Sequence, residues 1–379
     1  MKIIRATTVP GSLNNFCRGL LSELQEREGY EVVALSSPGE ALDEIREREK
    51  VRTIAVAMQR HISPVNDLRS LWKLIRVFRK EKPDMVHSMT PKAGLLCMLA
   101  AWVCRVPVRI HTFTGLVFPT STGLKRKILM ATDWLTCACA THVIPEGEGV
   151  KNDLVTNRIT RKPLRVLGYG NVRGIDLNRF DPENPEVIKA AEIIRREEVL
   201  TFIFIGRLVG DKGITELVKA FCRLNKELPD TRLLLVGREE PQLDPLDSST
   251  LKEISDNPAI EAIGQKSDVR PWLLASDIFV LPSHREGFPN VVIEAGAMGL
   301  PSIVTDINGS REIIHDGENG LIVPVKNANA LYEAMKHLAE TPEEIRTMAA
   351  NARPMIASRF EQSFVRQCLK DYYKEILAK

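Results

Sequence analysis

The 379-residue sequence lacks several features that mark common functional classes. Its seven cysteines are odd in number and include no Cys-x-x-Cys pair, so we expect a reduced protein and not a disulfide scaffold. Histidine and cysteine show no zinc-like spacing. The longest apolar run, at 94–104, has 11 residues and is too short to span a bilayer. The chain starts MKIIRATTV, which already has the pattern of a strand, so we expect no cleaved leader.

Charge is distributed unevenly along the chain. Residues 1–172 contain 26 Lys and Arg against 16 Asp and Glu, whereas residues 173–379 contain 26 against 33. Two solvated surfaces could differ this much by ordinary fluctuation. The alternative is that the first half meets an anionic partner, either a lipid diphosphate or the cytoplasmic leaflet of a membrane. Basic residues are not interleaved with exposed aromatics, so we do not expect nucleic-acid binding.

Short apolar runs alternate with helical patterns throughout the chain. This alternation predicts an α/β protein with parallel sheets covered by helices on both faces, and the length favours two domains. We expect domains at 1–173 and 174–360, with a last helix at about 361–379. The expected strands are 2–8, 31–36, 51–57, one starting at 84, 108–114, 141–145, 164–167, 201–205, 232–236, 259–263, 278–281, 302–305 and 321–323.

Four helical segments of the sequence carry further expectations. A helix is expected at 13–27, and a short one at 267–274 is expected to be capped by Ser267. The segment 67–82 is amphipathic and is expected to pack its apolar face inward, although a membrane-surface role stays open. The segment 116–135 fits either a leaflet-docking surface or a core helix with a basic edge. The apolar face of 67–82 has Leu68, Leu71, Trp72, Ile75 and Phe78. The apolar residues of 116–135 that are expected to be exposed are Val117, Phe118 and Trp134.

The stretch 278–300 has the clearest pattern for a binding site. A buried strand at 278–281 leads through a polar loop into a helix at 290–298, with Pro289 expected at its first position. The next amides, of Asn290 and Val291, would then point out of the helix and form an anion site. Glu286 in the loop and Glu294 in the helix place one carboxylate ahead of these amides and one behind them.

Three motifs together resemble those of the family 4 glycosyltransferases. Glu286 and Glu294 within EGFPNVVIEAGAMGLP are similar to the paired-glutamate signature of that family. FIGRLVGDKG at 204–213 resembles the segment in which an arginine and a lysine hold the donor diphosphate, here Arg207 and Lys212. The segment 306–324 resembles the family's loop and strand after the glutamate helix. The resemblance implies the GT-B fold, with two facing Rossmann-like domains and a C-terminal helix that crosses back to the first.

Weaker matches extend the resemblance into the first half of the chain. TPKAG at 90–94 is similar to a segment of capsule and O-antigen transferases, and Lys92 is the candidate contact for the acceptor phosphate; a surface lysine fits equally well. Gly11 matches a family loop, often with two glycines, that contacts donor or acceptor. Ser12 replaces the second glycine, and a plain turn fits Gly11 as well. Thr114 stands where relatives carry a cleft histidine, and His111 does not match that position.

The resemblance continues through the segment that joins the two domains and into the second domain, which is expected to supply the nucleotide contacts. The segment 168–180 is similar to the family's interdomain segment, with Arg173 where an asparagine is common. Gly264 and Gln265 are expected to flank the base. The remaining residues of the expected donor site are Phe288, Pro289, Asn290, Val291 and Glu294.

The resemblance implies a retaining, hexosyl-type transferase that moves a sugar from a UDP-sugar to a polyprenyl-diphosphate-linked glycan. The sequence has no Asp-x-Asp pair for a metal, so we expect no metal or other cofactor and assign the diphosphate charge to Arg207, Lys212 and the helix amides. Glu286 would hold the donor sugar and Glu294 the ribose. We expect a cytoplasmic protein on the inner face of the membrane. A UDP-sugar 2-epimerase and a non-catalytic sugar-nucleotide-binding protein are the alternatives.

Overall fold

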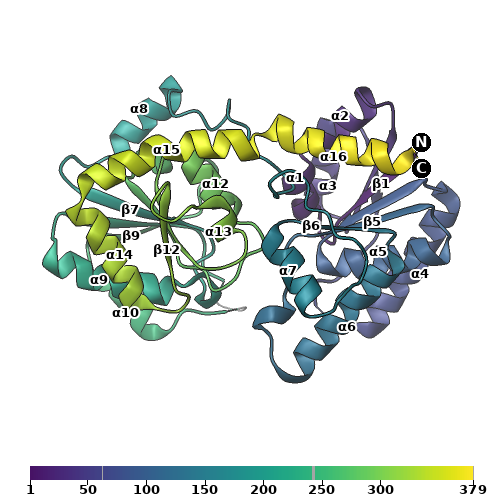
Figure 1. Cartoon of the computed structure of the whole chain (residues 1–379), viewed down its shortest axis with the longest axis horizontal. Coiled ribbons are helices and arrows are strands. Elements are labelled where there is room, and N and C mark those ends of the chain that lie inside the picture. Colours follow the sequence, from purple (N-terminus) through teal and green to yellow (C-terminus); the bar gives the residue numbers. More distant parts are fainter. Residues whose placement is uncertain (62, 241–243, 379) are drawn as a thin grey trace. The chain divides into compact units, whose positions relative to one another are not determined.

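The computed structural model describes residues 1–61, 63–240 and 244–378 (Figure 1). Its contacts divide the chain into two compact units, Met1–Gly174 with Ser363–Lys379 and Ile175–Gln362. Each unit is built on one six-stranded parallel sheet. Strands buried on both faces of a parallel sheet consist of nearly continuous apolar residues, and most strands of both sheets follow this pattern.

The first unit has the strand order β3-β2-β1-β4-β5-β6. Helices α4 to α7 pack over one apolar cluster, whereas α1, α2, α3 and the C-terminal helix α16 pack over the other. Strands and helices of this unit are β1 Lys2–Ala6, α1 Pro10–Cys17, α2 Leu20–Glu26, β2 Glu31–Ser36, α3 Glu40–Glu49, β3 Arg52–Ala55, α4 Pro64–Glu81, β4 Met85–Met89, α5 Pro91–Val103, β5 Val108–Phe113, η1 Phe118–Thr120, α6 Gly123–Cys139, β6 His142–Pro145, α7 Glu148–Thr156 and α16 Gln362–Leu377.

The second unit has the order β12-β11-β10-β7-β8-β9. Its first helix shows how the sequence sets a helix start: the Asn184 side chain accepts hydrogen bonds from the amides of Glu186 and Val187, and Pro185 occupies the first turn. The elements are α8 Pro185–Ile194, β7 Leu200–Ile205, η2 Gly210–Lys212, α9 Ile214–Glu227, β8 Thr231–Val236, α10 Ser248–Asp256, β9 Ile260–Gly264, α11 Arg270–Leu274, β10 Ile278–Leu281, α12 Asn290–Ala297, β11 Ser302–Thr305, α13 Ser310–Ile313, β12 Gly320–Val323, α14 Ala328–Glu340 and α15 Pro342–Phe360.

Several local expectations are wrong. The single helix expected at 13–27 is broken into α1 and α2 at Gly19, whose backbone is left-handed (φ +72°). The expected strand at 164–167 does not form, because only Leu164 makes an isolated bridge, to Val143. The short helix α11 begins at Arg270 with Val269 as its N-cap, so Ser267 is not the cap.

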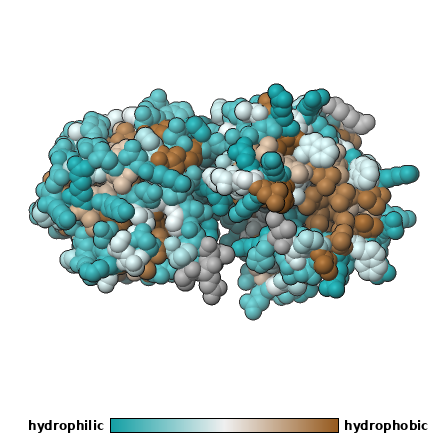
Figure 2. All heavy atoms as spheres, turned by 90° about the horizontal axis from the view of Figure 1, so that it is seen from below, coloured by the Kyte–Doolittle hydropathy of each residue, from teal (hydrophilic) through white to brown (hydrophobic). Residues whose placement is uncertain are grey.

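The exposed surface of the first unit also differs from the expectation. Phe118 is fully buried, whereas Leu68 and Trp72 of α4 are 67% and 53% exposed and do not pack inward. Of the expected apolar face, Phe78 is buried, and Leu71 and Ile75 are partly buried against the same core cluster. Ser70 and Leu74 complete the inward face of α4. Figure 2 shows hydrophobic side chains gathered on the surface of this unit. No helix of the described residues is both long enough and apolar enough to cross a bilayer.

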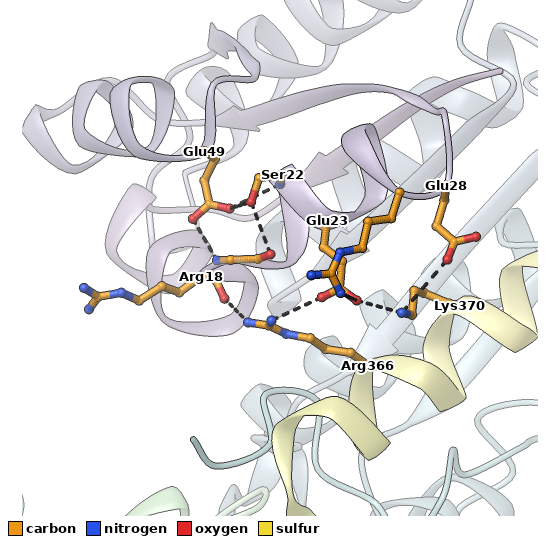
Figure 3. A network of polar contacts seen from close by, with 9 residues as sticks. Arg18, Ser22, Glu23, Glu28, Glu49, Arg366 and Lys370 are labelled. Carbon is orange, nitrogen blue, oxygen red and sulfur yellow. Dashed lines mark hydrogen bonds and ion pairs between the residues drawn. The ribbon is translucent and has the colours of Figure 1, made fainter. Parts of the chain in front are cut away.

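The C-terminal helix α16 is attached to the first unit by buried charges as well as by apolar contacts (Figure 3). Glu23 of α2 accepts hydrogen bonds from Arg366 at 3.2 Å and from Lys370 at 2.6 Å. Burial opposes ionisation of Glu23, but the Lys370 hydrogen bond and the Arg366 charge outweigh it and lower the pKa of this carboxyl. On the same helix, the Tyr373 hydroxyl accepts a hydrogen bond from buried Arg5 at 2.6 Å. These contacts fix the last segment of the chain to its first strand and second helix.

Candidate active site

Polar side chains collect at the carboxyl ends of β7, β8, β9 and β10 in the second unit, which is where open parallel sheets bind ligands. The loop after β7 carries Lys212 and the loop after β10 carries Glu286. These two side chains form an ion pair in which each is 17% exposed. Glu286 also accepts a hydrogen bond from the Ser283 hydroxyl at 2.9 Å. The structure therefore brings together two of the expected catalytic residues from different loops.

The backbones of these two loops are in direct contact. A Cβ atom at Gly213 would lie 2.1 Å from the carbonyl oxygen of Pro282, so only glycine allows the approach. The His284 amide donates to the Asp211 carbonyl at 2.9 Å. The Arg285 side chain pairs with the Asp211 carboxylate at 3.1 Å. Lys212 is thereby held against the loop that bears Glu286.

The loop after β11 packs against the loop that bears Glu286. Gly309 has φ +75°, and a Cβ atom there would lie 2.6 Å from the Gly287 carbonyl oxygen. The Thr305 hydroxyl donates a hydrogen bond to the Ser283 carbonyl. The segment 306–324, noted in the sequence only as a motif, thus helps to shape the loop between β10 and α12.

Arg207 lines an open pocket of about 380 Å³ at the carboxyl ends of β7, β8 and β9. Gln265 lines the same pocket, together with Arg238 and Lys266. Gly264, at the end of β9, has φ +70° and no atom within 4 Å of a Cβ position. Arg207 donates a hydrogen bond to Glu240 at 2.9 Å, and this contact is the main reason that the pKa of Glu240 is lowered.

Helix α12 begins at Asn290, as expected, but the place of Pro289 differs from the expectation. Pro289 is its N-cap and not its first helical residue, and the Val292 amide donates to the Pro289 carbonyl at 3.0 Å. Asn290 and Val291 therefore occupy the first turn, where helix amides face an anion. Pro289 is buried, and the Phe288 ring packs against Phe360 with ring centroids 5.5 Å apart, so both side chains are part of the packing of this unit. Glu294 is half-buried on the same helix.

The expected residues of the first unit lie at the starts of two helices. Gly11 and Ser12 form the first turn of α1, and nothing lies within 4 Å of a Cβ position at Gly11. Lys92, in the first turn of α5, pairs with Asp67 at 2.5 Å. His111 is buried against Ser88, and burial lowers its pKa to about 3, so it is a neutral core residue. Thr114 is half-buried after β5.

Sequence reasoning missed Ser283, Asp211, Arg285 and Glu240. Only Ser283 has a signal in the sequence, because it stands three residues before its partner Glu286. The partners of the other three residues lie on different loops, and the sequence does not show which loops are in contact. In the part of the chain that the structure describes, no group of three or more His, Cys, Asp or Glu side chains is arranged to hold a metal ion.

Comparison with known proteins identifies the family. Residues 11–170 match the model "Glycosyl transferase 4-like domain" and residues 200–341 match "Glycosyl transferases group 1". The capsular polysaccharide biosynthesis glycosyltransferase CapM of Staphylococcus aureus is 31% identical over 377 residues, which cover 99% of this chain and 97% of that protein. The UDP-Gal:alpha-D-GlcNAc-diphosphoundecaprenol alpha-1,3-galactosyltransferase of Escherichia coli is 28% identical, over 84% of this chain and 82% of that protein.

Among solved structures, HepE of Anabaena in complex with UDP has a TM-score of 0.80 at 16% identity and covers 99% of both chains. WaaG, a glycosyltransferase involved in lipopolysaccharide biosynthesis, has a TM-score of 0.73 at 15% identity and covers 97% of this chain and 98% of its own. These likenesses confirm the expected fold class, GT-B with two Rossmann-like domains. With the family models and the match to CapM, they establish that the chain belongs to the family 4 glycosyltransferases and is a transferase enzyme.

Proposed function

We propose that this enzyme transfers a hexosyl group from a UDP-sugar to a polyprenyl-diphosphate-linked glycan in capsule or O-antigen synthesis, with retention of anomeric configuration. The names of the S. aureus and E. coli relatives support the pathway and the type of acceptor, and the UDP complex of HepE supports the nucleotide. The observation that carries the proposal is that the Lys212–Glu286 pair and the pocket that Arg207 lines lie at the carboxyl ends of strands of the same sheet.

The chemistry follows from the charge that develops on the leaving group. When the bond between the sugar and the diphosphate oxygen breaks, negative charge grows on the diphosphate, and Arg207, Lys212 and the first-turn amide of Val291 offset it. The acceptor oxygen forms the new bond on the same face of the sugar, and its proton passes to an oxygen of the departing diphosphate. Glu286 accepts hydrogen bonds from the donor-sugar hydroxyls and Glu294 from those of the ribose. No metal or other cofactor is needed in this scheme.

The first unit would hold the acceptor. Lys92 is the proposed contact for the acceptor diphosphate, with Asp67 as the partner that positions its ammonium group. Gly11 and Ser12 lie in the first turn of α1, where the amides of a helix start face an anion or a sugar hydroxyl.

The test is transfer from a panel of UDP-sugars to undecaprenyl-diphosphate-linked acceptors, with and without EDTA, and with NMR assignment of the new anomeric bond. Lys212→Met and Glu286→Gln should each lower kcat/KM by about 100-fold or more, because each removes a contact to the reacting groups. Lys219→Met, at an exposed lysine of α9, is the matched control and should retain activity. Loss of turnover in EDTA would contradict the metal-free scheme. Conversion of the donor without acceptor would instead identify the epimerase.

We also propose that the first unit docks on the inner face of the cytoplasmic membrane. Helices α4, α5 and α6 pack side by side and expose Leu68, Trp72, Trp102, Leu124 and Trp134 by 53% to 73%. The Arg76 guanidinium lies 3.4 Å from the centroid of the Trp72 ring, so basic and aromatic groups share this surface. Tryptophan and basic side chains together favour the interface of an anionic bilayer.

Vesicle sedimentation tests the docking surface. The enzyme should sediment with vesicles that contain phosphatidylglycerol and much less with vesicles of phosphatidylcholine alone. The double variant Leu68→Ser/Trp72→Ser should lose most of this binding. Ile193→Ser, which changes an 83% exposed isoleucine in the second unit, should bind as the wild type does. Equal binding by the double variant and the wild type would remove α4 from the docking surface.

A further inference from the structure

Glu240 is a carboxylate that contacts two of the cationic side chains lining the pocket of the second unit. One of its oxygens accepts a hydrogen bond from Arg207 at 2.9 Å, and the other accepts one from Arg238 at 3.0 Å. Both arginines line the pocket, whereas Glu240 lies beside them with 17% of its side chain exposed. The site therefore contains an internal anion bonded to the arginine that the donor diphosphate needs.

Backbone contacts between two loops place Glu240 close to Arg207. The Leu208 amide donates to the Arg238 carbonyl at 2.9 Å, and Leu208 and Glu239 form a parallel bridge. The loop after β8 is thereby hydrogen-bonded to the loop after β7 at the residue next to Arg207. Glu240 is placed by the main chain, so its contact with Arg207 is a built feature of the site.

We propose that Glu240 competes with the diphosphate of the nucleotide for Arg207, and that it thereby weakens nucleotide binding and speeds release of the nucleoside diphosphate product. This inference rests on the proposed function, because it assumes that Arg207 binds a diphosphate. A carboxylate that shares a guanidinium with a diphosphate repels it, and the guanidinium forms fewer hydrogen bonds to each. Product release limits turnover in many enzymes, so a resident competitor can raise the rate at which the site empties.

Glu240→Gln separates charge from shape. Glutamine keeps an oxygen that can accept the Arg207 hydrogen bond, but it removes the negative charge. We expect the Kd for UDP to fall about threefold to tenfold and the dissociation rate of UDP in stopped-flow measurements to fall by a similar factor. Uridine, which has no phosphate, should bind both proteins equally. Glu239→Gln removes the same charge one residue away, at an exposed side chain, and should leave the Kd for UDP within twofold of the wild type.

The outcomes are distinct. If UDP does not bind the wild type, the proposed function fails before Glu240 is tested. If UDP binds the wild type but binds Glu240→Gln equally or more weakly, Glu240 is a support for Arg207 and not a competitor, and the inference is overturned. If uridine also binds the variant more tightly, the change acts on the pocket as a whole and not on the diphosphate, which contradicts the inference too.

Discussion

Gly213→Ala tests whether contact between two loops positions Lys212. Gly213 follows Lys212 and has φ +71° and ψ 25°, in the left-handed region. A Cβ atom there would lie 2.1 Å from the Pro282 carbonyl oxygen, whereas ordinary contact starts at 3.4 Å. The loop would therefore have to withdraw from the end of β10 by about 1.3 Å, the difference between these distances. Lys212 would move with it, away from Glu286.

The expected size of the effect has two parts. Alanine in a left-handed conformation costs about 1–2 kcal/mol, and overpacking against a backbone oxygen costs about 1–3 kcal/mol more. Loss of the charged contact between Lys212 and a phosphate costs about 1.5–3 kcal/mol of binding free energy, which corresponds to roughly 10- to 150-fold weaker UDP binding. The variant should thus be both less stable and more weakly binding.

Gly317→Ala supplies the matched control. Gly317 also has a left-handed φ, +79°, in the same unit, but nothing lies within 4 Å of its Cβ position. It should lose only the conformational part of the stability and none of the UDP affinity. Urea unfolding and isothermal titration with UDP measure the two quantities. Equal losses of stability in the two variants, with unchanged UDP affinity in Gly213→Ala, would refute the view that this close packing positions Lys212.

Two further predictions concern buried polar groups of the first unit. Tyr373→Phe removes the hydroxyl that bonds Arg5 and His87, and should lower the free energy of unfolding by about 1–3 kcal/mol in urea, whereas Tyr372→Phe, at a likewise buried tyrosine, should have a smaller effect. Burial in α6 raises the pKa of Asp133 to about 7, so the folded state favours its protonated form and loses stability as the pH rises from about 4 to about 7. Asp133→Asn should therefore be more stable than the wild type at pH 8, by on the order of a few kcal/mol, and should show little difference at pH 4; an unchanged pH profile would contradict the raised pKa.

The sequence predicted the elements whose signals are local. Apolar runs such as Ile278–Leu281 became strands at nearly the expected bounds, because a strand buried on both faces needs no partner-specific pattern. The break at Gly19 was missed, since a single glycine inside a helical pattern is compatible with a continuous helix until the chain packs. The outward direction of Trp72 was missed because the face that α4 buries is set by α5, and the sequence of α4 alone does not define it.

The site residues divide in the same way. Glu286 and Lys212 stand in motifs, but their contact depends on the close packing of Gly213 against Pro282 and of Gly309 against Gly287. The sequence does not show which residue either glycine packs against. Glu240 follows β8, and its role as partner of Arg207 depends on which strand lies beside β7. Sequence can name the groups that carry charge, whereas the pairing of those groups is a property of the sheet order.

That pairing has a consequence for catalysis. Lys212, Arg207 and Arg285 are each bonded to a carboxylate, of Glu286, Glu240 and Asp211 respectively, so the cluster is stable without an anion from outside. In the proposed function, a diphosphate that binds these cations would compete with the carboxylates for them, and part of its binding energy would be offset by the contacts it weakens. Weak ground-state binding is no loss for an enzyme, because only contacts that strengthen in the transition state accelerate the reaction. In the proposed reaction, charge would accumulate on the diphosphate as the sugar bond breaks, and the competition for the cations would shift toward the leaving group. The same cations would then contribute most in the transition state.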